Sequence, residues 1–385
     1  MAGVSKVTLN GEVLMDVTEM TVDADNLLAG ETALKNNGDP VTGTLVVSPG
    51  APDGHSWTRV EIPMSVWGQG SAFYVTDMAY GNGKYVALVN TNYHGGYGSS
   101  DPTKLLYSTD LTNWTTVILS GHYDSIAFGN GMFLLLENGG DETTANIAYS
   151  SDLVNWTYTN SNQVSSDEMT AWTDVKCTDG TFYIIDDAGE NGVSTDLINW
   201  DYGGPNYIGE AASMDDGYAV FAPDGGSYID IDRIKQTSPH TKNINTHSVE
   251  VTTDRGYGGW AGTFCGNGKY GAVLCESDNG GTYYRMLCTS DYGDTWTDAI
   301  LPIPSVGYDY WIDCAYGNGK YIFLCRPLNN DKSYFLISTD CVNFETFEGP
   351  LIGFIEYGGG AFFGCAGISE SDKVAIYYSR TTNDY

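Results

Sequence analysis

The chain repeats one short polar segment five times, and this repetition constrains its fold more than any other feature. The segment first reads YSTDLTNWT at residues 107–115. It returns as YSSDLVNWT (149–157), VSTDLINWD (193–201), ISTDCVNFE (337–345) and, in a longer variant, CTSDYGDTWT (288–297). A pattern that recurs at near-constant spacing is typical of a structural repeat rather than of a single site. We therefore interpret the segment, which we call the box, as a building block of the fold.

Each box has a local physical explanation. Its Ser or Thr and its Asp can accept hydrogen bonds from nearby backbone N–H groups, as Asx and Ser/Thr turns do, while the aromatic residue fills the space beneath. The carboxylates are therefore predicted to be occupied and structural. The residues concerned are Asp110 and Trp114, Asp152 and Trp156, Asp196 and Trp200, Asp291 and Trp296, and Asp340 and Phe344.

The longer variant carries a family resemblance. Thr289, Asp291, Gly293, Thr295 and Trp296 fit the pattern S/T-x-D-x-G-x-T-W and resemble the Asp-box of sialidase-like propellers, and the other four copies are one residue shorter. In that family the box lies on the outer part of a blade, away from the ligand. The resemblance implies that these Asp residues are not catalytic.

A second repeated element predicts the number of units. Apolar strands turn at an Asn-Gly, Asp-Gly or Gly-Gly pair in seven places, and an Asn-Gly or Asp-Gly pair between apolar strands is a strong hairpin signal. The repeat length of roughly 50 residues, with two hairpins per unit, is typical of a four-stranded propeller blade. The seven segments are 79–88, 127–136, 176–185, 213–221, 264–273, 315–324 and 356–365.

The ends of the chain predict how the ring closes. The last unit stops at YYSRTTNDY (377–385) without a fourth strand, whereas HSWTRVEIP (55–63) reads as a fourth strand with nothing before it. The sequence thus predicts an all-β, seven-bladed β-propeller over residues 55–385, closed by this N-terminal strand, which leaves no open sheet edge. Residues 47–54 form a Pro/Gly/Ser linker, and residues 1–46 a small β-rich module.

The fourth unit is irregular because its box is degenerate. We expect residues 228–234 and 246–254 to form its outer hairpin, with residues 235–245 as an inserted loop.

Composition limits the partners of such a fold. The chain carries 17 Lys and Arg against 49 Asp and Glu, a formal net charge of −32. That charge repels phosphate backbones and anionic lipid, so we expect neither nucleic acid binding nor membrane insertion. Neutral polymers, or anionic ones bridged by a cation, remain open. The eight Cys residues include no C-x-x-C and are predicted to be free thiols in a protein assembled in a reducing compartment.

The N-terminal module carries a second resemblance. The runs V-x-L-N-G-x-x-L-x-D-x-T, A-D-x-L-L-x-G-x-T-A and G-x-x-V-T-G-T, between Val7 and Thr44, look like the N-terminal attachment segment of tail proteins in phages and prophages. The resemblance implies a component of a virion tail or tail fibre, assembled in the bacterial host cytoplasm. Residues 1–46 would then bind other tail or baseplate proteins.

A ligand site is predicted at the mouth of the central channel. The box turns and the Gly-rich turns share one face of the ring, so the longer connections lie on the opposite face, where function usually resides. Aromatic side chains recur where the first strand of a blade enters the ring, and sugars pack on such rings beside hydrogen-bonding carboxylates. The alternative is that the aromatic residues only fill space between blades. The candidates are Tyr123, Trp172, Trp260, Trp311, Asp124, Asp174 and Asp313.

Catalytic and metal sites are not expected. The six Arg residues do not recur at an inner-strand position, as a sialidase site would need, and the five His residues are not at ligand spacing. No cofactor is predicted, although calcium in an Asp-rich loop such as Asp186, Asp187 and Glu190 stays an alternative to solvated surface charge. A pair of carboxylates would suffice for glycoside hydrolysis, so a propeller glycosidase is the first rival.

The resemblance of the N-terminal module implies a phage tail protein, and with the predicted site at the channel mouth we expect it to bind carbohydrate on the host cell surface through the β-propeller. Weak binding of single sugars favours a homo-oligomer, and the family resemblance favours a trimer. A glycosidase that trims the same polymer, and a structural or decoration protein of the virion, are the alternatives.

Overall fold

A computed structural model gives the fold of the chain over part of its length. The chain divides into two compact units, Met1–Ala51 with Thr381–Tyr385, and Pro52–Arg380. In strands β1–β4 and β17–β21 only the backbone is described. The structure describes residues 6–9, 12–16, 32–34, 40–42, 54–63, 73–90, 102–137, 146–160, 172–178, 180–186, 191–202, 211–215, 218–222, 228–238, 241–250, 256–278, 281–291, 294–303, 310–327, 332–366 and 373–379.

The first unit contains two short strand pairs. β1 (Lys6–Leu9) pairs with β2 (Glu12–Asp16), and β3 (Thr32–Leu34) pairs with β4 (Pro40–Thr42). The rest of the predicted attachment module lies outside the described residues.

The second unit is a β-propeller of four-stranded antiparallel blades. Six of its sheets use four consecutive strands, and a seventh combines three C-terminal strands with β5. The first three blades are β6 (Tyr74–Gly81), β7 (Lys84–Asn90), β8 (Lys104–Ser108) and β9 (Thr115–Ile118); β10 (Ser125–Gly129), β11 (Met132–Leu136), β12 (Asn146–Ser150) and β13 (Thr157–Asn160); and β14 (Trp172–Thr178), β15 (Thr181–Asp186), β16 (Asn191–Ser194) and β17 (Asp201–Tyr202).

The remaining blades complete a ring. The first strand of each blade contacts the first strand of the next, and β30 contacts β6. These blades are β18 (Ala211–Asp215), β19 (Tyr218–Ala222), β20 (Tyr228–Ser238) and β21 (Thr241–Glu250); β22 (Gly256–Gly266), β23 (Lys269–Asp278), β24 (Gly281–Thr289) and β25 (Thr297–Ile300); β26 (Tyr310–Gly317), β27 (Lys320–Pro327), β28 (Lys332–Ser338) and β29 (Glu345–Pro350); and β30 (Phe354–Gly358), β31 (Ala361–Cys365), β32 (Lys373–Ser379) and β5 (Trp57–Pro63).

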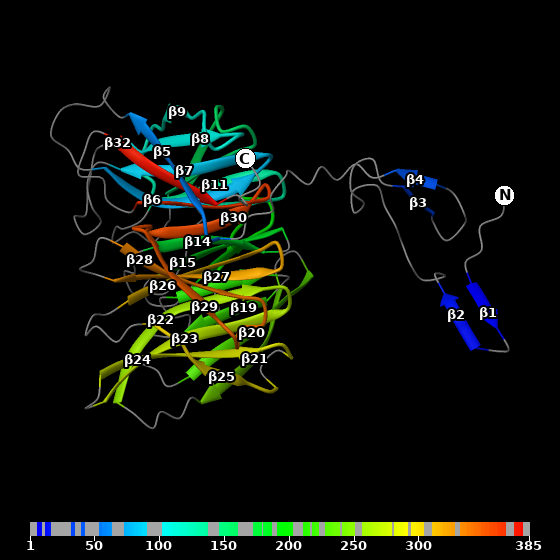
Figure 1. Cartoon of the computed structure of the whole chain (residues 1–385). Helices are drawn as coiled ribbons and strands as arrows, with labels where there is room; N and C mark the ends of the chain where they lie inside the picture. Colours follow the sequence, from blue (N-terminus) through cyan, green and yellow to red (C-terminus); the bar gives the residue numbers. More distant parts are fainter. Residues whose placement is uncertain are drawn as a thin grey trace. The chain divides into compact units, whose positions relative to one another are not determined.

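The predicted closure by the N-terminal strand is confirmed. β5 pairs along its whole length with β32, from Trp57 opposite Ser379 to Pro63 opposite Lys373, and Figure 1 shows the two strands side by side in blue and red. Gly54, which the sequence assigned to the linker, is buried in this closure. Its N–H donates to Ser379 Oγ at 3.0 Å, and its carbonyl accepts from Trp57 Nε1 at 2.8 Å.

The core lies between neighbouring blades, which explains the continuous apolar runs of the second strands. In β11, Phe133 and Leu135 pack against blade 1, whereas Leu134 and Leu136 pack against blade 3. Successive side chains of a strand point to opposite faces, so a sheet that is covered on both faces needs apolar residues at every position.

The outer hairpin of the fourth blade corrects a prediction. Residues 235–245 were expected to form an inserted loop, but β20 and β21 continue through them as a paired ladder from Tyr228 opposite Glu250 to Ser238 opposite Thr241. Both strands of the segment carry β-branched residues, Thr237 on one and Thr241 and Ile244 on the other, which suits an extended backbone.

Cys288, Cys325, Cys341 and Cys365 are buried, whereas Cys177, Cys265, Cys275 and Cys314 are half-buried. Within the described ranges, no helix is long and apolar enough to span a membrane.

Candidate functional site

Each box forms the turn between the third and fourth strands of a blade, and its carboxylate accepts hydrogen bonds from residues of the same box. Asp110 accepts hydrogen bonds from the backbone of Thr112 at 2.9 Å, and from the backbone and side chain of Asn113 at 2.7 Å each. These bonds hold the pKa of Asp110 well below its usual range, with the backbone bond from Asn113 the largest cause. Asp152, Asp196 and Asp340 repeat the arrangement, and Asp291 is held by Thr295.

The apolar residues of the box form a wedge against the preceding blade. Leu153 is fully buried in the core between blades 1 and 2, where Trp156 packs beside it and donates through Nε1 to the Leu153 carbonyl at 3.1 Å. The wedge requires a left-handed backbone, since Leu153 has φ of 70°. Its burial offsets that strain, so the box is a structural joint between blades.

The box and the Gly-rich turn are physically connected. Asn82, in the first turn, donates through Nδ2 to the Ser151 carbonyl in the box of blade 2, and Lys84 Nζ donates to the Asp152 carbonyl at 2.8 Å. Lys269 makes the equivalent bond to the Asp340 carbonyl at 3.1 Å. In these two places the turn of one blade is tied to the box of the next blade.

Of the four aromatic residues predicted at the mouth of the channel, the structure describes the side chain of Tyr123. Tyr123 is only 5% exposed and packs in the core between blades 1 and 2, which is the packing alternative considered above. Trp172, Trp260 and Trp311 begin or lie in the inner strands β14, β22 and β26, but their side chains lie outside the described part of the chain.

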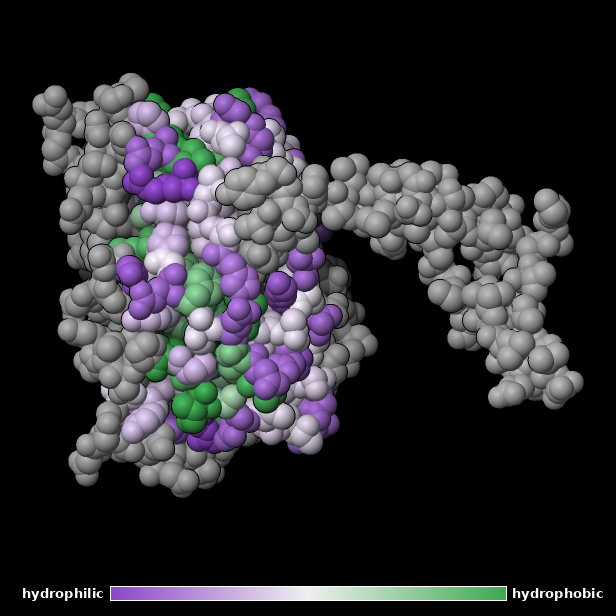
Figure 2. Space-filling view, viewed as in Figure 1, coloured by the Kyte–Doolittle hydropathy of each residue, from purple (hydrophilic) through white to green (hydrophobic). Residues whose placement is uncertain are grey.

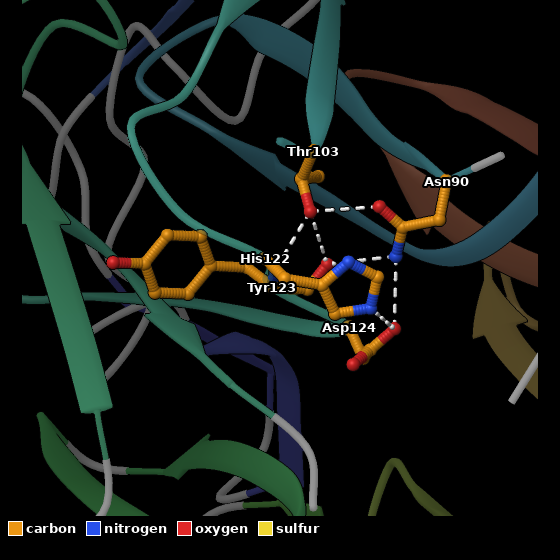
Figure 3. A network of polar contacts seen from close by, with 5 residues as sticks. All are labelled: Asn90, Thr103, His122, Tyr123 and Asp124. Carbon is orange, nitrogen blue, oxygen red and sulfur yellow. Dashed lines mark hydrogen bonds and ion pairs between the residues drawn. The ribbon is translucent and has the colours of Figure 1, made fainter. Parts of the chain in front are cut away.

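Asp124 belongs to a buried polar network at the face opposite the boxes. Asn90 Nδ2 donates to Asp124 Oδ1 at 2.8 Å and to the Tyr123 carbonyl at 3.0 Å, while Thr103 Oγ1 donates to Asn90 Oδ1 at 2.7 Å (Figure 3). His122 Nε2 lies 3.3 Å from Asp124 Oδ1. With 4% exposure, Asp124 is not available to a sugar.

This network joins two connections of what we call the loop face. Asn90 ends β7 and Thr103 precedes β8, whereas Tyr123 and Asp124 lead into β10. Backbone bonds strengthen the joint, since Thr103 N donates to the Gly121 carbonyl and Leu119 N to the Thr103 carbonyl. The ends of both connections are therefore held rigidly on the ring.

Asp174 and Asp313 lie elsewhere, among charged groups that converge on the axis of the ring. They come from the innermost strands of blades 3 and 6, and Asp77, Lys176 and Glu356 come from the innermost strands of blades 1, 3 and 7. Lys176 Nζ forms an ion pair with Asp174 at 2.8 Å. We call these five residues the axial group, because groups from four blades interact electrostatically with Lys176.

Two axial carboxylates also join blades. Asp77 accepts from its neighbour Met78 N and, across the interface, from Ile126 N at 2.8 Å. Asp313 repeats this with Cys314 N and with Ile355 N at 2.9 Å. Both oxygens of each carboxylate are thus occupied, which leaves Glu356 as the axial carboxyl with the most exposed surface.

The pKa values of four members of the axial group, Asp77, Asp313, Glu356 and Lys176, are all raised, but for different reasons. Burial raises the pKa of Asp77 and of Asp313, and enclosure by protein together with the Asp313 charge raises the pKa of Glu356 to about 8. Burial by itself lowers the pKa of Lys176, but the carboxylates of Asp174 and Asp77 outweigh it and raise that pKa. The axis therefore holds a protonated ammonium beside carboxyl groups that are reluctant to ionise.

Sequence reasoning missed Asp77, Lys176 and Glu356, although the repeat contained a signal. Asp77, Asp174 and Asp313 each stand six residues before the last Gly of their hairpin turn, whereas Asp124 stands seven before Gly131. One residue reverses the face on which a strand side chain lies. Aligning the repeats by that Gly would have separated Asp124 from the axial group.

Among the described residues, no group of three or more His, Cys, Asp or Glu side chains is placed so that it could hold a metal ion. The segment with Asp186, Asp187 and Glu190 lies outside the described side chains.

Comparison with known proteins supports the fold but does not indicate a function. No family model matches the sequence. No curated protein matches it either. Among solved structures, YCF48 bound to a D1 peptide is similar with a TM-score of 0.56 and 13% identity, over 87% of this chain and 99% of that one.

Two further structures are enzymes. The hydrazine synthase of Kuenenia stuttgartiensis is similar with a TM-score of 0.54 and 8% identity, over 80% of this chain and 96% of that one. The GH74 enzyme of Niastella koreensis has a TM-score of 0.50 and 10% identity, over 82% of this chain and 44% of that one. At such identities the likeness shows a β-propeller of four-stranded blades and carries no function with it.

Proposed function

We propose that this chain is a tail protein of a phage virion whose propeller binds carbohydrate on the host cell surface. Residues 1–46, through their resemblance to tail attachment segments, would dock on other tail or baseplate proteins, and the propeller would present its loop face to the host. Several copies would act together, with a trimer favoured, because multivalency compensates for weak binding of single sugars.

The observation that carries the proposal is the difference between the two faces of the ring. On one face the box carboxylates already accept hydrogen bonds from backbone N–H groups of their own box. On the loop face, the buried Asn90 network anchors the ends of connections whose sequences are long and polar, such as NTNYHGGYGSSDPTK at residues 90–104. Polar loops on a rigid frame are the usual setting for recognition.

The described surface suits a polar ligand. Figure 2 shows hydrophilic residues interleaved with separate hydrophobic ones on the face that it draws. The exposed large hydrophobic residues are spread over several blades, at Ile118, Val154, Tyr158, Ile198, Ile300 and Val342. Such scattered residues are normal on a surface and do not make a protein-docking patch.

Glycan binding can be tested with the purified full-length protein on an array of bacterial surface glycans and on a panel of bacterial strains. We expect saturable binding that weakens in Asn90→Ala, because that change removes the two hydrogen bonds that Asn90 Nδ2 donates to Asp124 and to the Tyr123 carbonyl, and the one that Asn90 Oδ1 accepts from Thr103. Asn82→Ala, on the box face, is the control and should bind as the unaltered chain does. Absence of binding to every glycan and strain would contradict the proposal and favour a structural or decoration role.

Assignment to the virion has its own test. Mass spectrometry of particles purified from a culture that produces the chain should find it at a constant ratio to the major tail proteins. Its absence from purified particles would refute the tail assignment.

A glycosidase is the second candidate, because the axial group offers a carboxyl that stays protonated at neutral pH. Glycoside hydrolysis needs such an acid beside an ionised carboxylate, and the pKa of Glu356 is raised to about 8 by its surroundings. Release of reducing ends from a bound polysaccharide, abolished in Glu356→Gln, would favour this candidate. Binding without product release favours the receptor-binding role.

A further inference from the structure

Two cysteines meet at the interface between blades 5 and 6. Cys288 lies near the end of β24 in blade 5, and Cys341 is the wedge residue in the box of blade 6. Both belong to the same core cluster, with exposures of 3% and 1%. The S–H of Cys341 donates to the sulfur of Cys288. The two thiols are therefore in contact, although they belong to different blades.

These two places hold larger side chains at other interfaces. Tyr107 and Leu153 occupy them between blades 1 and 2, and Tyr149 and Leu197 occupy them between blades 2 and 3. A single buried Cys is an ordinary small apolar residue. Two Cys residues that replace both partners of one contact also form the reactants for a disulfide bond.

A lysine beside the pair favours the thiolate of Cys288. Lys269 Nζ donates to the carbonyl of the residue before Cys341 at 3.1 Å. The hydrogen bond from Cys341 lowers the pKa of Cys288 against the opposing effect of burial, and the Lys269 charge lowers it further. In blade 1 the equivalent Lys84 lies over the ring of Tyr107, 5.0 Å from its centroid. The same lysine position thus faces an aromatic ring in blade 1 and a thiol in blade 5.

The neighbouring thiols are less easily ionised than Cys288. Burial raises the pKa of Cys314 and of Cys325, which lie in the same interface. The pKa of Cys341 is also raised, first of all because its proton is shared with Cys288. Since the thiolate is the reactive form of cysteine, Cys288 is the nucleophile of the pair and Cys341 is the thiol that can attack it afterwards.

We propose that Cys288 and Cys341 form an oxidisable pair, which hydrogen peroxide converts to a disulfide that links blade 5 covalently to the box of blade 6. Peroxide is little larger than water and so suits a thiol of low exposure. The inference goes beyond the proposed function and does not depend on it.

The reaction has two steps. The Cys288 thiolate attacks one peroxide oxygen and breaks the O–O bond, which gives a sulfenic acid and a hydroxide that takes up a proton to form water. Cys341 then loses its proton and attacks the Cys288 sulfur, so that the S–S bond forms, the S–O bond breaks and a second water leaves. The two thiols lose two electrons and two protons, and the peroxide gains them.

The test treats the full-length chain with hydrogen peroxide, blocks the remaining thiols with N-ethylmaleimide and digests the product without reductant. Mass spectrometry should find the peptides of Cys288 and Cys341 joined. The oxidised chain should melt roughly 5 °C higher than the reduced chain, because the link closes a loop of the unfolded chain. Dithiothreitol should reverse both changes.

Matched variants identify the residues responsible. Cys341→Leu introduces the wedge residue of other boxes, so it should fold and form no linked peptide, and Cys288→Ser should form none either. Lys269→Met should slow the oxidation by roughly threefold, because a smaller share of Cys288 would be thiolate. Lys84→Met, the same change in blade 1, is the control and should leave the rate unaltered.

Each contrary outcome overturns a stated part of the inference. Thiols that peroxide leaves unreacted, a Cys288 that ends as sulfinic acid without linked peptides, or a disulfide between other cysteines of the interface would overturn the pair itself. Equal rates in the Lys269 and Lys84 variants would overturn the role of the ammonium. Equal melting temperatures of the linked and the reduced chain would overturn the locking of the two blades.

Discussion

At the scale of single residues, the same kind of side chain has opposite chemistry at two places in the repeat. In a box, an Asp at the surface gains several N–H donors, and these favour its ionised form. On the inner strand, Asp77 and Asp313 also accept two hydrogen bonds each. There the burial of the carboxyl outweighs these bonds and favours the neutral form. The balance between local donors and desolvation therefore decides how each carboxyl responds to pH.

The boxes predict a loss of stability in acid. Local hydrogen bonds, first of all the backbone bond from Asn199, lower the pKa of Asp196 to about 2 from 3.8. A depressed folded pKa contributes stability above the unfolded value, which is lost as pH falls through the folded one, here between about pH 4 and pH 2. In Asp196→Asn we expect lower stability at pH 7 and a smaller loss of stability as pH falls. The new side-chain amide would place its own N–H groups against the N–H groups of Asn199, which now donate to the carboxylate. Thermal melts from pH 2 to 7 measure this, and an equal fall in melting temperature of the variant and the unaltered chain between pH 4 and pH 2 would contradict it.

The axial group predicts the reverse dependence at higher pH. The pKa of Glu356 is raised to about 8, so the unfolded chain ionises first as pH rises above 4.5, and the folded state loses stability up to about pH 8. Because Glu356 keeps an exposed surface, solvent screens part of this effect. Glu356→Gln should flatten the decline in melting temperature between pH 4.5 and 8.5. An unchanged slope would show that Glu356 does not titrate in this range.

At the scale of elements, the propeller depends on contacts between different blades more than on any blade alone. The turn of one blade donates to the box of the next, the box wedge fills the interface behind it, and Asp77 and Asp313 join inner strands. A single blade would expose both apolar faces, so neither motif is stable in isolation.

Gly54 gives a sharp test of the closure. It has φ of 79°, and an added Cβ would lie 2.3 Å from Ile322 Cδ1. Gly54→Ala should therefore combine left-handed strain with a steric clash that Ile322 can only partly relieve, a cost of about 2–3 kcal/mol. Gly83→Ala is the matched control, since Gly83 has φ of 71° with open space around it and should lose only about 1 kcal/mol. Denaturant unfolding measures both, and equal losses would mean that the clash is absent.

At the scale of the whole molecule, β5 turns a curved row of sheets into a closed ring. Without it, β32 would present an open edge, and Ile62 would leave the core between blades 7 and 1. We therefore expect the closed ring to unfold as one unit, because every blade is packed between two neighbours.

Two truncations separate closure from the N-terminal unit. Removing residues 1–51 leaves β5 in place and should preserve cooperative unfolding with a similar melting temperature. Removing residues 1–64 deletes β5 and should cost at least about 3 kcal/mol through the lost core contacts, together with aggregation at the open edge. Calorimetry with light scattering distinguishes the two, and equal stability of both truncations would refute the role of β5.

The sequence by itself determined whatever is local and repeated: the four-stranded unit, the boxes with their occupied carboxylates, and the closure by residues 55–63. Each of these depends on turn chemistry, strand periodicity or missing strands, which can be read along the chain. Only the tertiary structure showed that Tyr123 and Asp124 are buried, that Asp77, Lys176 and Glu356 meet at the axis, and that β20 and β21 continue as a paired ladder up to Ser238 opposite Thr241. These features depend on which face each strand presents and on which blades lie across the ring, and a one-residue change of phase reverses the first without altering the composition.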